Sequence, residues 1–132
     1  FMCIGNKGAG TLKRLFADRF TITFEEVVKL PWSFATASVL AERLIASNPF
    51  RLKVVSNKYK SLVNYDTVAA HTVTLAEAQT MDKGEYSKAM DVYSFEPSIY
   101  EVWNDLHEFY YGCVVYGAYL EAATSEQSAR MT

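Results

Sequence analysis

Residues 98–132 read SIYEVWNDLHEFYYGCVVYGAYLEAATSEQSARMT, and this stretch decides the fold. It contains no proline, and apolar residues recur through it every three or four positions, which is the spacing of one face of an α-helix. Pro97 stands immediately before it, at a position where a proline commonly opens a helix. The sequence therefore predicts one long helix over residues 98–132.

Two apolar seams run along this predicted helix on roughly opposite faces. The first seam alternates in steps of four and three through Ile99, Trp103, Leu106, Tyr110, Cys113, Gly117 and Leu120. The second seam does the same through Tyr111, Val115, Ala118, Ala122, Ser125, Ala129 and Thr132, and it becomes small towards its end. This is the spacing of coiled-coil a and d positions. We expect the helix to pack on a sheet at its start and to enter a two-helix coil at its end.

Short strand and helix patterns alternate over the preceding residues. Strands are predicted for residues 2–4 and 20–24, and helices for residues 11–17 and from residue 33 to about residue 47. Two further strands are predicted for residues 50–59 and 62–73, joined as a hairpin through Lys60-Ser61. Residues 76–89 are polar and read as a loop with one helical turn. These patterns predict an α/β domain that carries a helix able to join a coiled coil.

Composition excludes several classes of protein. The chain of 132 residues has a formal charge of -2 and therefore no basic footprint for nucleic acid. Its two cysteines, Cys3 and Cys113, lie far apart among apolar residues, which is typical of buried thiols in a reducing compartment. No run reaches the roughly 18 apolar residues of a membrane span. The chain begins in mid-strand without an initiator Met and ends without a helix stop signal, so we expect an internal fragment.

The glycines of residues 5–10, GNKGAG, suggest a phosphate-binding loop, because they follow a strand and precede a helix. Their spacing matches neither G-x-G-x-x-G nor G-x-x-x-x-G-K-[ST]. We interpret them as a strand-to-helix turn.

No other cluster predicts an active site. His107 stands between Asp105 and Glu108, but no second strong metal ligand follows at helical spacing, so a solvated face is expected. His71 lies in a predicted strand without a nucleophile nearby. Trp32 and Trp103 are interpreted as core or interface anchors.

Three segments resemble the gamma subunits of F-type ATP synthases. Residues 123–132, ATSEQSARMT, are similar to the signature that opens the C-terminal helix of that family. Its matching residues are Ser125, Glu126, Gln127, Ala129, Arg130 and Met131. Residues 93–97, YSFEP, resemble the stretch before that helix, and residues 54–61, VVSNKYKS, resemble a strand of the family. The resemblance covers nearly the whole chain.

The resemblance implies a fold and a role. Residues 1–97 would form part of an incomplete Rossmann-like α/β domain, and residues 98–132 would pack on it and open the C-terminal coiled-coil shaft. The chain would be the central fragment of a rotor subunit that transmits torque from a proton-driven c ring to the catalytic ring of alpha and beta subunits. Such a subunit has no catalytic, cofactor-binding or metal residues.

The resemblance also implies contacts and a location. Tyr93, Phe95 and Glu96 would form a foot that meets the c ring and the epsilon- or delta-type stalk subunits. The coiled-coil seam that meets the subunit's own N-terminal helix would be Ala118, Ala122, Ser125 and Ala129. The chain would lie peripheral to the mitochondrial inner membrane on its matrix face, or to a bacterial plasma membrane on its cytoplasmic face. An orphan nucleotide-binding or redox domain and a generic coiled-coil adaptor are the alternatives.

Overall fold

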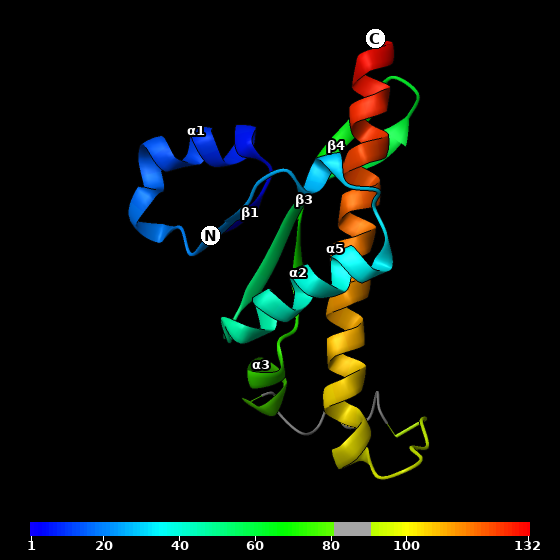
Figure 1. Cartoon of the computed structure of the whole chain (residues 1–132). Helices are drawn as coiled ribbons and strands as arrows, with labels where there is room; N and C mark the ends of the chain where they lie inside the picture. Colours follow the sequence, from blue (N-terminus) through cyan, green and yellow to red (C-terminus); the bar gives the residue numbers. More distant parts are fainter. Residues whose placement is uncertain (81–90) are drawn as a thin grey trace. The chain divides into compact units, whose positions relative to one another are not determined.

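The computed structural model describes residues 1–80 and 91–132 of the chain. Contacts divide it into two compact units, Phe1–Ser33 and Phe34–Thr132 (Figure 1). The predicted division between residues 97 and 98 followed the change from mixed structure to pure helix. The long helix belongs to the same compact unit as the segment from residue 34 onward, which packs on two of its sides. The assignment of residues 1–97 to a domain and of residues 98–132 to the start of a shaft stays a prediction.

The first unit is a strand–helix–strand motif. It contains β1 (Met2–Ile4), α1 (Asn6–Phe16) and β2 (Ile22–Phe24), with 3₁₀ turns at Ala17–Arg19 and Val27–Lys29. β1 and β2 pair in parallel, with Met2 opposite Ile22 and Ile4 opposite Phe24. Parallel neighbours require a crossover connection, which α1 provides. The two predicted strands are confirmed.

The turn between β1 and α1 is shorter than predicted. Gly5 alone has a positive φ, of 103°, which a residue without a Cβ adopts at little cost. α1 begins at Asn6, five residues before the predicted start, so Gly8 and Gly10 lie inside the helix. The glycines therefore form no extended loop that could surround a phosphate.

The second unit contains a helix, a hairpin and the long helix. Its elements are α2 (Phe34–Ala46), β3 (Leu52–Ser61), β4 (Asn64–Thr72), α3 (Leu75–Thr80) and α5 (Ile99–Met131). β3 and β4 are antiparallel, with Leu52 opposite Thr72 and Ser61 opposite Asn64. The turn is therefore Leu62-Val63 rather than the predicted Lys60-Ser61. In Figure 1, α2 crosses α5 and the hairpin runs beside the C-terminal half of α5.

The core of this unit lies between α2 and α5. Its buried apolar residues are Ala37, Leu40, Ala41 and Leu44 of α2 together with Tyr111 and Val115 of α5. The α2 residues recur at i, i+3, i+4 and i+7, which places them on one face. Gly112 of α5 faces the ring of Phe34, and a Cβ there would lie 3.0 Å from Phe34 Cζ. Small residues thus let the two helices approach closely.

The connection after β4 begins with a capped helical turn. Thr74 Oγ1 donates to the Phe50 carbonyl at 2.7 Å and accepts the Glu77 N–H at 3.1 Å, which caps α3. This agrees with the single turn predicted within residues 76–89, of which residues 81–89 lie outside the described part. The described strands form two two-stranded sheets. A mixed helix and strand fold with a long C-terminal helix is confirmed, whereas the Rossmann-like arrangement stays a prediction.

Candidate interaction surface on the long helix

The hairpin is fastened to α5 by three hydrogen bonds between side chains of the helix and the backbone of β3. The Tyr59 N–H donates to the Glu121 carboxylate at 2.8 Å. Ser128 Oγ donates to the Ser61 carbonyl at 2.9 Å. The Ser125 hydroxyl lies 3.2 Å from the Asn57 carbonyl and shares its single proton between that carbonyl and the Glu121 carbonyl of its own helix, at 2.8 Å. Asn57 and Tyr59 use backbone groups that do not face β4, so α5 covers the edge of β3 that the hairpin leaves open. We name these three contacts the edge clamp.

The edge clamp explains the small residues near the end of α5. Ser125 is only 1% exposed and Ser128 is 2% exposed, because the backbone of β3 passes directly over them. The prediction that the start of the helix packs on a sheet is therefore wrong. That its end packs on another helix stays a prediction. The sheet lies on the C-terminal half of α5, while α2 and α3 flank its earlier turns.

The predicted coiled-coil seam has a mixed environment within the second unit. Ser125 is buried under β3, Ala118 and Ala122 are half-buried, and Ala129 is exposed. Tyr111 and Val115, earlier on the same seam, belong to the core with α2. Most of this face is thus occupied by the unit itself.

The first seam of α5 is the face that is exposed to solvent in this unit. Leu106 and Leu120 are each 43% exposed and Tyr110 is 42% exposed, although all three are large and apolar. Together with Cys113, Gly117 and Thr124 they continue the alternation of four and three steps. We name Leu106, Tyr110, Cys113, Gly117, Leu120 and Thr124 the exposed stripe. A hollow of about 360 Å³ between Tyr59 and the stripe residues Gly117, Leu120 and Thr124 deepens it.

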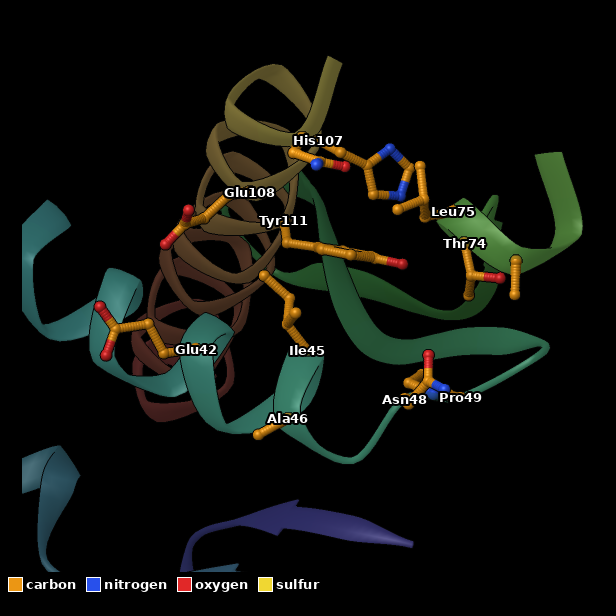
Figure 2. A pocket seen from close by; sticks show the side chains of 12 residues that line it. Glu42, Ile45, Ala46, Asn48, Pro49, Thr74, Leu75, His107, Glu108 and Tyr111 are labelled. Atoms are coloured by element: carbon orange, nitrogen blue, oxygen red, sulfur yellow. The ribbon is translucent and has the colours of Figure 1, made fainter. Parts of the chain in front are cut away.

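His107 and Tyr111 line a groove between α2, α3 and the N-terminal half of α5 (Figure 2). The imidazole of His107 stands edge-on to the ring of Tyr111, with ring centres 4.7 Å apart. Its Nε2 is buried without a hydrogen-bond partner among the described residues. Burial lowers the pKa of His107 and is the main cause that raises the pKa of Tyr111. The expectation that His107 lies on a solvated face is wrong, because its ring is half-buried in this groove beside Tyr111 and Leu75.

The remaining candidate groups show no catalytic arrangement. His71 Nε2 lies 3.0 Å from the Glu77 carboxylate and so ties the end of β4 to α3. Trp32 and Trp103 are half-buried. Within residues 1–80 and 91–132 no group of three or more His, Cys, Asp or Glu side chains could hold a metal ion. None of the described helices combines the length and apolar character that a membrane span needs.

Comparison with known proteins identifies the family. A family model described as ATP synthase matches residues 1–132, the whole chain. Mitochondrial ATP synthase gamma subunits are among its relatives: that of Arabidopsis thaliana is 31% identical and that of Drosophila melanogaster 30%. The chain belongs to the ATP synthase gamma-subunit family. The matches cover 100% and 98% of this chain but only 42% of each relative.

A solved ATP synthase structure contains a chain with the same fold. The structure of the central stalk and c ring of the Tetrahymena thermophila mitochondrial ATP synthase contains a chain that superposes with a TM-score of 0.79 at 22% identity. The superposition covers 97% of this chain and 55% of that chain. It supports the mixed helix and strand fold described above.

The family signature lies on the last two turns of α5. Ser125 is buried in the edge clamp, and Glu126 pairs with Arg130 on the outer side of the helix. Gln127, Ala129 and Met131 are exposed. Glu126 and Arg130 are exposed as well, so every residue of this signature except Ser125 lies on the surface of the unit.

The predicted foot lies directly before α5. Tyr93 is 66% exposed, Glu96 is exposed and Phe95 is half-buried.

The exposed stripe, Glu121 and Ser128 were not predicted as functional residues. Glu121, Ser125 and Ser128 are spaced at i, i+4 and i+7, the spacing at which buried apolar residues usually recur on a helix. Polar residues at these positions were the signal that could have revealed the edge clamp.

Proposed function

We propose that the chain is part of the central-stalk rotor subunit of an F-type ATP synthase. This subunit transmits torque from the proton-driven c ring to the catalytic ring of alpha and beta subunits. The observation that carries the proposal is the match of the whole chain to the gamma-subunit family. In this role the chain performs no chemistry and binds no cofactor.

The second unit suits a rigid lever. α5 has 33 residues, which at a rise of 1.5 Å per residue makes a rod about 50 Å long. The edge clamp and the core with α2 hold this rod along two sides. Torque applied to the hairpin or to α2 would therefore turn α5 with little internal slippage.

A further helix of the same subunit would lie on the exposed stripe. Coiled-coil spacing, exposed apolar side chains and the hollow at Gly117 support this face. Ala118, Ala122 and Ser125 are less suited, because α2 and β3 already occupy their surroundings. Ala129, beyond the hairpin, remains available to the same helix or to the surrounding ring.

The wider assembly follows from the same assignment. The parallel β1–α1–β2 motif supports a Rossmann-like domain. The alpha and beta subunits would surround the shaft, and the foot would meet the c ring and the epsilon- or delta-type subunits. The mitochondrial relatives favour the inner membrane on its matrix face, with the chain held there through the c ring.

The proposal is tested by cross-linking in the whole complex. Cys3 and Cys113 are first replaced by serine, and a single cysteine is then placed at Tyr93. A cross-linker attached there should reach a c or epsilon-type subunit, whereas one on Val55→Cys, equally exposed but on the hairpin, should not. Products from position 93 with alpha or beta subunits alone would reject the predicted orientation. A chain that never co-purifies with the complex would reject the function itself.

A further inference from the structure

The groove at the N-terminal half of α5 has an apolar floor and an acidic rim. It encloses about 380 Å³, and Ile45, Leu75 and Tyr111 contribute to its floor. Glu42 of α2 and Glu108 of α5 stand on the same side of it, as Figure 2 shows. Both glutamates are exposed, and the described lining contains no Lys or Arg. We name this feature the acidic groove.

The charge of the acidic groove is not balanced by its own unit. Along α5, Glu101, Asp105 and Glu108 follow one another in steps of four and three, so like charges stand side by side on one helix face. Such pairs destabilise a helix by several tenths of a kcal/mol each. None of these carboxylates forms a described ion pair, whereas Glu26, Asp66, Glu77 and Glu126 elsewhere each do. Glu101 stands in the first turn of α5, where the helix dipole favours a carboxylate. Glu108 lies beyond that turn, and neither it nor Glu42 at the groove is explained by a described ion pair.

We propose that the acidic groove is a docking site for a basic segment of another protein in the assembly. This inference rests on the proposed function, since it assigns a partner chemistry to the rotor subunit. Arginine and lysine combine an aliphatic stem with a cationic head. The apolar floor of the groove suits the stem, and its acidic rim suits the head. The stem lies on Ile45 and Leu75, and the head reaches Glu42 and Glu108. An arginine head can satisfy both carboxylates, because its guanidinium presents five donors in one plane.

Other occupants fit the groove less well. An anionic membrane surface and a nucleic acid are repelled by the acidic row. A divalent cation needs more oxygen ligands than two separated carboxylates supply, and the described residues hold no metal-binding group of three.

A photoreactive residue in the groove tests the proposal within the whole complex. Benzoylphenylalanine replaces Ala46, which is exposed and lines the groove, or Val39, which is exposed on α2 outside it. Irradiation at position 46 should yield a cross-link to another subunit, through a peptide that contains Lys or Arg. Position 39 serves as the reference for nonspecific capture.

Charge removal then separates docking from mere proximity. Glu42→Gln with Glu108→Gln should lower the yield at position 46 about tenfold, and so should about 0.5 M salt. Glu25→Gln, an exposed carboxylate of the first unit, should leave it unchanged. Capture of lipid, of this chain itself, of a peptide without basic residues, or of nothing beyond the level at position 39 overturns the inference. Co-purification of the variants with the complex is measured separately, so failure of docking is distinguishable from failure of the proposed function.

Discussion

Ser125 and Ala129 are separated by one helical turn but have opposite environments. Ser125 lies under the backbone of β3 and bonds to Asn57, whereas Ala129 is exposed. Ser125→Leu should therefore lower the free energy of unfolding by about 2 to 4 kcal/mol, through overpacking and a lost hydrogen bond. Ala129→Leu should change it by less than about 0.5 kcal/mol, since leucine is a good helix former on an open surface. Urea unfolding of both variants measures the difference.

The same pair shows why residue roles were hard to predict. Spacing placed Ser125 and Ala129 on one seam, and the spacing is correct. It could not reveal that Asn57 of β3 lies above Ser125, because that contact joins residues 68 positions apart. If Ala129→Leu proved the more damaging change in the isolated chain, the described path of the hairpin over α5 would be contradicted.

His107 should make stability depend on pH. Burial lowers its pKa below the ordinary value of 6.5, so the folded chain keeps the imidazole neutral. As the pH falls below about 6.5, the unfolded chain binds a proton that the folded chain resists, and stability decreases. The rings of Tyr110 and Tyr111 stand beside the imidazole, and Glu108 lines the same groove. Urea midpoints at about pH 7.5 and 5.5 should differ less for His107→Gln than for the unchanged chain.

A matched variant isolates this effect from the other histidine. His71→Gln removes the group beside Glu77 but leaves the ring of His107 in place. It should retain the loss of stability that His107 causes on acidification. An unchanged pH dependence in His107→Gln would show that other groups control it.

At the scale of elements, two glycines of α5 give opposite expectations. A Cβ on Gly117 would meet no atom within 4 Å, whereas one on Gly112 would lie 3.0 Å from Phe34. Gly117→Ala should stabilise the isolated chain by about 0.5 to 1 kcal/mol, because alanine is the better helix former. Gly112→Ala should gain less or lose stability, because the ring of Phe34 has to move. Thermal unfolding of the two variants measures both effects.

The same glycine tests whether a further helix packs on the exposed stripe, as proposed above. In a full-length subunit, a helix on the exposed stripe would approach Gly117, and an added methyl group would then obstruct it. The gain from Gly117→Ala should disappear there. A full-length subunit stabilised as much as the isolated chain would indicate that no helix packs at this position.

Local patterns predicted the elements well, because each depends on nearby residues. Alternating Thr and apolar residues gave β2, and the apolar spacing before Asn48-Pro49 gave α2. The start of α1 was missed because Gly8 and Gly10 are poor helix formers, although the helix includes both. The long helix was clear, but which of its faces stays free depends on α2 and the hairpin, and periodicity alone does not contain that information.

At the scale of the whole molecule, the exposed stripe should make the isolated chain associate. Its leucines and Tyr110 present apolar surface that two copies can bury against each other. Sedimentation velocity at increasing concentration should show an average mass rising above the 14.9 kDa of one chain. Leu106→Glu with Leu120→Glu should keep the chain monomeric. Val39→Glu with Val55→Glu, which alters apolar residues that are even more exposed elsewhere, should leave association unchanged.

The full-length subunit turns this measurement into a test between a rotor subunit and a generic adaptor. In a rotor subunit, a helix of the same polypeptide covers the exposed stripe, and its local concentration far exceeds that of a second copy. The full-length chain should therefore remain monomeric, and Leu106→Glu with Leu120→Glu should lower its stability rather than its association. In an adaptor the stripe stays open to other chains, so the full-length chain would associate as the isolated one does. Association of the full-length chain that the two glutamates abolish would therefore support the adaptor and reject an intramolecular shaft.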